Sequence, residues 1–219
     1  MAHPDQFVAI RNGYWHQWRL QHPEQPIDLS VADLTHLDLR NINLRDANLI
    51  GADLRGSNLT GADLSHANLI GVELRGVCLR GADFSHANLT RADLSYVDGT
   101  DATFNHATLE QANLHQAELV GAYLYAANLR GARLLSTHLT GAYLAEADLT
   151  EASLDNADLR WAVLQKAIVH NATLQRTQIR GAVLRGATFH GATLQMLGVD
   201  SGQLEGADLR QAIVPDEPT

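Results

Sequence analysis

Three histidines recur at intervals of twenty residues, at His66, His86 and His106. Imidazole is a common ligand of divalent transition metals, and it is the side chain that titrates nearest to neutral pH. If the chain returns to the same place every twenty residues, these rings lie about 5 Å apart above Asp46, close enough to share a metal ion or to repel one another when protonated. Exposed imidazoles that merely stack are the alternative, and the column contains no second carboxylate. We therefore predict no metal site and no cofactor.

Aromatic side chains follow the same spacing further along the chain. Tyr123, Tyr143 and Val163 are twenty residues apart, Tyr125 lies beside the first of them, and Trp161 comes two residues before Val163. Exposed aromatic clusters often mark protein interfaces. The alternative is that Trp161 only covers a neighbouring glycine backbone. We predict that these five residues bind a protein partner.

Residues for catalysis are missing from the pattern. The glycine-containing runs belong to a repeat and do not open a helix as a phosphate-binding loop does. The single cysteine, Cys78, has no placed histidine partner that would activate it. The sequence therefore predicts a protein that is not an enzyme.

The element that positions all these residues is a repeat of five. From residue 27 to 214 an apolar residue, usually leucine, occupies every fifth position, as at Leu29, Leu34 and Leu39. Five residues turn an α-helix by about 500°, so these leucines would scatter around a helix. A flat strand fails as well, because five is odd and alternate leucines would reverse faces. The chain must bend once per pentad, and four bends of about 90° close a square coil of about twenty residues.

The positions around each leucine support such coils. The residue two places earlier is usually alanine, which shares the inward face with the leucine. The residue before the leucine is often Asp or Asn, whose side chains bond nearby backbone at turns. The second residue after it is often glycine, as at Gly51 and Gly71, where a corner needs permissive dihedral angles. A fixed repeat of this length is typical of a solenoid.

The run ANLIGADLRGSNLTGADLSHANL, from Ala47 to Leu69, resembles the pentapeptide-repeat proteins, and the resemblance extends over residues 27 to 214. It implies an all-β fold, a right-handed quadrilateral β-helix, which agrees with the right-handed preference of parallel crossovers. Some members of the family resemble B-form DNA and bind DNA gyrase or related topoisomerases. Others regulate cell differentiation in filamentous photosynthetic bacteria. The family thus implies binding and leaves the partner open.

Three regions follow from the repeat: an N-terminal helical cap at 1–26, the β-helix at 27–214 and a short tail at 215–219. Apolar residues at helical spacing between Pro4 and Pro23 predict a capping α-helix, with Trp15 and Trp18 over the first coil. A helix that binds a partner is the alternative. The C-terminal coil has no evident cap, and exposed strand edges invite pairing. We hypothesise a homodimer through that coil, or a partner docked on it.

Composition restricts where the protein works. The chain has 219 residues, a formal net charge of −9 and no apolar run long enough to span a bilayer. We find no charged leader followed by an apolar segment, so we expect a cytoplasmic protein that contacts neither membrane nor nucleic acid directly.

The charge also bears on DNA mimicry. About nine and a half coils at roughly 4.8 Å each make a rod of about 45 Å. The repeat then averages about one net negative charge per 6 to 7 Å, whereas DNA has about one per 1.7 Å. A basic band that includes Arg160, Arg176 and Arg185 would repel a DNA-binding surface. We therefore predict a non-enzymatic protein-interaction or regulatory module with an unknown partner. A DNA mimic that binds gyrase or a related topoisomerase is the alternative.

Overall fold

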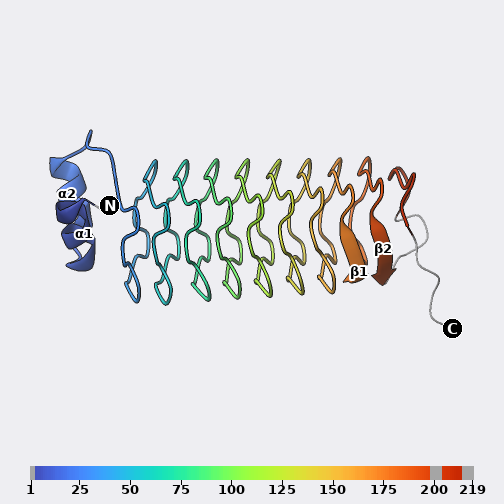
Figure 1. Cartoon of the computed structure of the whole chain (residues 1–219), viewed down its shortest axis with the longest axis horizontal. Coiled ribbons are helices and arrows are strands. Elements are labelled where there is room, and N and C mark those ends of the chain that lie inside the picture. Colours follow the sequence, from blue (N-terminus) through green and yellow to red (C-terminus); the bar gives the residue numbers. More distant parts are fainter. Residues whose placement is uncertain (1–2, 198–203, 214–219) are drawn as a thin grey trace.

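The computed structural model describes residues 3–197 and 204–213 as a helical cap followed by a rod of stacked coils (Figure 1). The helices are α1 (Pro4–Arg11) and α2 (Trp15–Gln21), and the continuous strands are β1 (Thr173–Gln178) and β2 (Thr193–Leu197). Within the described ranges, no helix is both long enough and apolar enough to cross a bilayer.

The cap differs from the single helix that the sequence predicts. Residues 12–14 break it into two, because Gly13 takes a φ of +74° that a continuing helix does not allow. Trp15 and Trp18 stack with their ring centroids 5.2 Å apart, and both are buried against the core of the rod. The indole N–H of Trp15 donates to the carbonyl of Asn43 in the first coil. The tryptophans therefore cover that coil, as expected.

The cap also imitates a preceding coil at one strand edge. Gln6 is completely buried, and its Nε2 donates to the carbonyl of Pro26 at 2.7 Å. Its Oε1 accepts from the backbone N–H of Asp28, also at 2.7 Å. The backbone N–H of His3 donates to the carbonyl of Asp28 at 2.8 Å. Both main-chain groups of Asp28 that face the cap therefore have partners.

Beyond the cap, residues twenty positions apart pair as parallel bridges, as between Asp53 and Glu73 and between Tyr123 and Tyr143. Each pentad contributes a short extended piece and then a two-residue corner. Among residues 3–197 and 204–213, only β1 and β2 form a longer ladder, which is parallel. The coil has four faces and belongs to the right-handed quadrilateral β-helix class, which confirms the predicted fold. The leucines and alanines point inward and form one continuous buried core.

The corners use the chemistry that the sequence indicates. The second residue after almost every core leucine has a left-handed φ, for example +62° at Gly71 and +60° at His66. The carboxylate of Asp53 accepts the backbone N–H of Arg55 at 3.1 Å, and the amide oxygen of Asn58 accepts that of Thr60 at 2.9 Å. The Asp or Asn side chain thus stabilises the bend that follows it.

Candidate interaction face

One face of the rod carries an apolar column instead of the usual polar side chains. Tyr123, Tyr143, Val163 and Val183 are consecutive partners in the parallel ladder. We call these four residues, with Trp161 and Tyr125 at the adjoining corners, the aromatic face. The two tyrosine rings stack at a centroid distance of 5.0 Å and are nearly parallel, at 4°. Tyr123 is 43% exposed, Tyr143 46% and Val183 46%, whereas Val163 is half-buried.

Trp161 lies at the corner that leads into the aromatic face. It is 63% exposed and has a left-handed φ of +62°, at a column where glycine is the usual residue, as at Gly141 and Gly181. Its indole lies on Gly181 of the next coil, where an added Cβ would overlap the ring. Trp161 therefore covers glycine backbone and also presents a large apolar surface to solvent.

Tyr125 lies at the corner that leaves the same face. Its hydroxyl donates to a carboxylate oxygen of Glu146 at 2.9 Å, and its ring meets His106 edge to face at 5.3 Å. The hydrogen bond to Glu146, with the carboxylate charge, raises the pKa of the Tyr125 hydroxyl. Within the described part of the chain, neither Tyr125 nor Trp161 forms a ring contact with the stacked tyrosines. The face is a flat strip with an aromatic residue at each edge.

The charges around this strip differ from one end to the other. Lys166 lies 3.6 Å from Glu146 and Arg160 pairs with Asp158 at 2.6 Å, so these cations are neutralised locally. The Arg160 guanidinium and the Thr140 hydroxyl also help to lower the pKa of Asp158, against the opposing effect of its partial burial. Arg180 and Arg185, at the two corners that flank Val183, have no carboxylate of the described residues within 4.0 Å, which leaves this end of the strip positively charged.

The histidine column forms as a stack and not as a metal site. His66, His86 and His106 have centroid distances of 4.8 and 4.9 Å and interplanar angles of 9° and 8°. The nitrogen lone pairs of imidazole lie in the ring plane, so face-to-face rings cannot aim them at one ion. Among the described residues, no group of three His, Cys, Asp or Glu could hold a metal. A second stack, His170 on His190 at 4.8 Å, was not singled out from the sequence.

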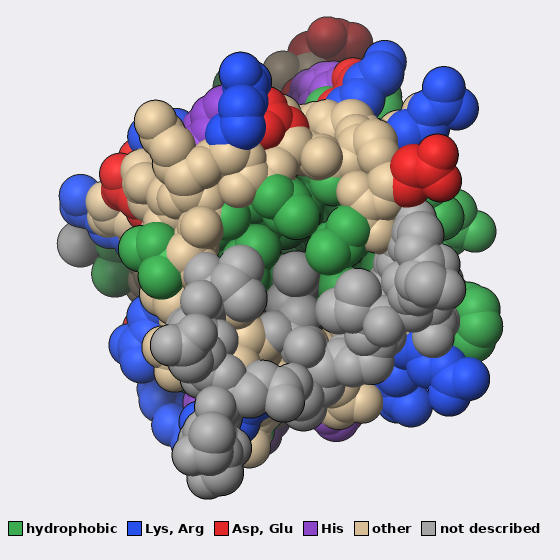
Figure 2. Space-filling view, turned by 90° about the vertical axis from the view of Figure 1, so that its right-hand side faces the viewer, with side chains coloured by type: hydrophobic (Ala, Val, Ile, Leu, Met, Phe, Trp, Pro, Cys, Tyr) green, Lys and Arg blue, Asp and Glu red, His purple; other side chains and the backbone are tan. Residues whose placement is uncertain are grey.

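The C-terminal end of the rod shows the interior of the solenoid. Leu204, Ala207, Leu209 and Ala212 are only partly buried, whereas the equivalent leucines and alanines in the middle of the rod are fully buried. Figure 2 looks at this end and shows hydrophobic side chains near its centre, with Lys and Arg side chains around the margin. Residues 198–203 and 214–219, which include part of the predicted terminal coil and the tail, lie outside the described residues.

Comparison with known proteins identifies the repeat. The family model for pentapeptide repeats matches in overlapping copies from residues 27–65 to residues 169–195. The chain is a pentapeptide-repeat protein. It is similar to HetL, described as a pentapeptide-repeat protein involved in heterocyst differentiation regulation, from the cyanobacterium Nostoc sp. strain PCC 7120. The identity is 32%, the TM-score is 0.54, and the match covers 93% of this chain and 97% of HetL.

A second solved pentapeptide-repeat rod shares the fold at lower identity. QnrB1, described as a plasmid-mediated fluoroquinolone resistance protein, is 21% identical in a trypsin-treated variant, with a TM-score of 0.57. The match covers 71% of this chain and 76% of that one. No curated protein sequence matched the chain. The recognition of the repeat family from sequence is thus confirmed.

Proposed function

We propose that this pentapeptide-repeat protein is a non-enzymatic interaction or regulatory module that binds a protein partner through the aromatic face. The supporting observation is the run of exposed Tyr123, Tyr143 and Val183, with Trp161 beside it, on a rod whose other ladders are mostly polar. A few residues supply most of the binding free energy at protein interfaces, and Trp, Tyr and Arg are enriched among them. The similarity to HetL, a protein involved in regulation, is consistent with this proposal.

The proposal does not assign the identity of the partner protein. Arg180 and Arg185, which have no carboxylate of the described residues within 4.0 Å, favour a partner surface with acidic groups at that end, because opposite charges steer association. We also propose that the open C-terminal coil is a site of homodimerisation or of partner docking, since its leucines are only partly buried. A strictly monomeric mass at high concentration would refute the homodimer. The cytoplasmic location remains a prediction.

A capture experiment tests the aromatic face. The full chain, immobilised, would be exposed to extract of its native host beside a Tyr143→Ala, Trp161→Ala double variant. The control is Tyr96→Ala, because Tyr96 is a tyrosine of similar exposure, 45%, on a different corner. We expect proteins that bind the wild type and the control but are lost from the double variant. A set of captured proteins that the double variant retains in full would refute this use of the face.

The alternative function, a DNA mimic that binds a topoisomerase, has less support from the charges. Several acids are neutralised by arginines of their own coil, as Asp53 is by Arg55 at 2.6 Å, whereas Arg180 and Arg185 have no acidic partner in the part of the chain that the structure describes. DNA presents an unbroken line of negative charge. A supercoiling assay separates the two functions: inhibition or protection of gyrase at micromolar protein would favour the mimic, and no effect would exclude it.

A further inference from the structure

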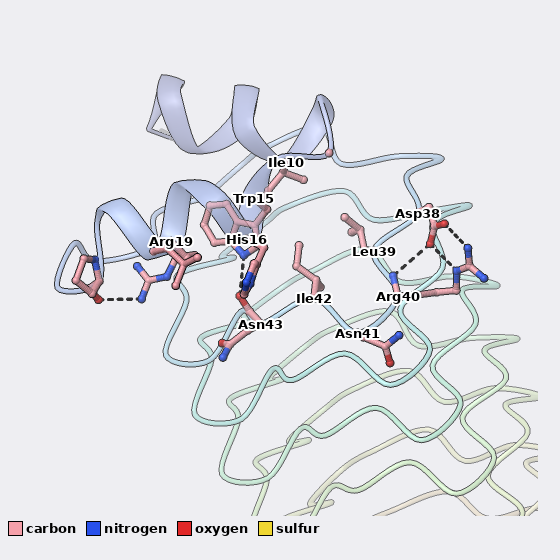
Figure 3. A pocket seen from close by; sticks show the side chains of 13 residues that line it. Ile10, Trp15, His16, Arg19, Asp38, Leu39, Arg40, Asn41, Ile42 and Asn43 are labelled. Atoms are coloured by element: carbon pink, nitrogen blue, oxygen red, sulfur yellow. Dashed lines mark hydrogen bonds and ion pairs between the residues drawn. The ribbon is translucent and has the colours of Figure 1, made fainter.

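The cap closes the first coil incompletely. A cavity of about 460 Å³ lies between the cap helices and the corner of the first coil formed by Asp38 to Asn43 (Figure 3). Ile10, Trp15 and Leu20 line it from the cap, and Leu39 and Ile42 line it from the coil. This volume is within the range of about 300 to 1,000 Å³ that is usual for ligand pockets. Polar and charged side chains, among them Arg19 and Asn43, also line it, so the cavity at the end of the tube is partly apolar and partly polar.

The strand edge beside this cavity differs from the edges between later coils. In later coils the N–H of Asn58 donates to the carbonyl of Leu37, and its carbonyl accepts from the N–H of Leu39. The equivalent groups of Asp38, one coil earlier, have no main-chain partner among the described residues. On another face of the same coil, Gln6 and His3 fill this role for Asp28. The corner beside the cavity is therefore an open strand edge.

The charges beside this open edge indicate which side chain an additional strand, paired with the edge, would carry. Between successive coils, a corner arginine contacts the acid of the next coil, as Arg80 does Asp98 at 3.2 Å and Arg130 does Asp148 at 3.4 Å. A strand added before Asp38 in the same register would place its own corner residue against the Asp38 carboxylate. That carboxylate is 60% exposed, although Arg40 already pairs with it at 2.6 Å.

We propose that this cavity binds an extended peptide segment of a partner protein, which adds a parallel strand to the Asp38 edge. The segment has the pattern apolar, any residue, apolar, basic. In this register its two apolar side chains lie over Leu37, which is only partly buried, and over Leu39, beside Ile42. Its backbone pairs with Asp38, and its basic side chain contacts the Asp38 carboxylate. Strand addition of this kind gains affinity from main-chain hydrogen bonds and specificity from pockets for alternate side chains. This site is separate from the aromatic face and does not depend on it.

The test uses a synthetic peptide with the sequence of residues 127–131, Ala-Asn-Leu-Arg-Gly, acetylated and amidated. It would be titrated to several millimolar into the isotopically labelled full chain, and NMR would follow the indole N–H of Trp15 and the methyl groups of Ile10 and Ile42. We expect saturable shifts at these groups and none at Tyr143. The same peptide with an N-methylated leucine, which cannot donate to the strand edge, should bind at least fivefold more weakly.

Two matched variants locate the site without disturbing the core. Leu20 lines the cavity and is 70% exposed, whereas Val31 is 74% exposed at the same end of the rod and does not line it. Leu20→Asp should weaken the peptide at least fivefold, and Val31→Asp should leave its affinity unchanged. The proposal is overturned if no shifts appear, if the N-methylated peptide binds equally well, or if both variants respond alike. It is also overturned if the cavity proves to be filled by a second copy of this chain, seen as concentration-dependent shifts of the same signals without peptide.

Discussion

Gln6 connects the cap to the rod, and its replacement provides a stringent test of the cap's role. The amide is completely buried and makes two hydrogen bonds of 2.7 Å, one to the carbonyl of Pro26 and one from the N–H of Asp28. Gln6→Leu keeps the approximate volume and leaves both backbone groups without a partner. A buried polar group that loses its partner costs about 1 to 3 kcal/mol, and two groups lose theirs, so we expect the docked cap to be destabilised by about 2 to 6 kcal/mol.

Coils contact only their neighbours, so this loss should be local. Hydrogen exchange at the backbone amide of Leu29, in the first coil, reports the loss, and the amide of Leu109, in the middle of the rod, serves as reference. Gln17→Leu is the matched control, because Gln17 is exposed on α2. If Gln6→Leu changed the protection of Leu29 by less than about 0.5 kcal/mol, comparable to an ordinary surface substitution, the reasoning about the cap would be wrong.

Gln6→Glu adds a pH dependence whose sign follows from the same contacts. The carboxylate can still accept from Asp28 N–H, but it is buried and faces the carbonyl of Pro26, which disfavours the charged form. The pKa of this glutamate in the folded state should therefore be raised above its unfolded value of about 4.3. Destabilisation is then largest above the folded pKa and is relieved as the pH falls, because the protonated acid can again donate to Pro26. Equal destabilisation at pH 4 and pH 8 would contradict this account.

Three further predictions concern the second half of the rod. In urea titration, Gly181→Ala should destabilise the protein more than Gly71→Ala does. Both glycines have a left-handed φ, at which a Cβ costs about 1 to 2 kcal/mol, but only at Gly181 would the new Cβ also overlap the Trp161 indole. Trp161→Gly should leave the urea midpoint unchanged or raise it, yet weaken partner capture; a clear loss of stability would mean that the indole serves mainly to cover backbone. The pKa of Asp208 is lowered by Arg210 and also by His190, whose Nε2 lies 3.0 Å from its carboxylate. Asp208 therefore contributes stability that is present above its ordinary pKa and is lost as the pH falls. In Asp208→Asn, the stability of the last coil should depend less on pH between 6 and 2 than it does in the wild type. NMR melts that follow the Phe189 amide measure this stability.

The sequence predicts the rod well because its signal is repeated in every coil. An inward leucine, an inward alanine and often a corner glycine recur in the pentads, and only one backbone path satisfies all of these constraints together. The cap is less predictable, because the turn at Gly13 that divides its helix is indicated by one residue only and not by a repeated pattern. The cavity beside it was missed for the same reason, although one signal was available. The first coil has Leu37 and Ile42 where the middle coils have smaller inward residues, such as Ser57 and Ala62, and larger side chains there indicate an interior that no preceding coil fills.

The aromatic face was found from the sequence because it departs from the repeat, and the cost of that departure supports a function. Earlier on the same face, the carboxylate of Asp63 accepts the backbone N–H of Ser65 at 3.0 Å, a bond worth about 0.5 to 1.5 kcal/mol. Tyr143 and Val183 cannot make it. Stacking offsets part of the loss for the tyrosines, by about 0.5 to 1.5 kcal/mol, but an exposed valine has no such compensation. Nor does the fold require a tryptophan at a left-handed corner where glycine is the usual residue. A surface that gives up stability at adjoining positions, and keeps large apolar groups exposed there, has the composition expected of an interface.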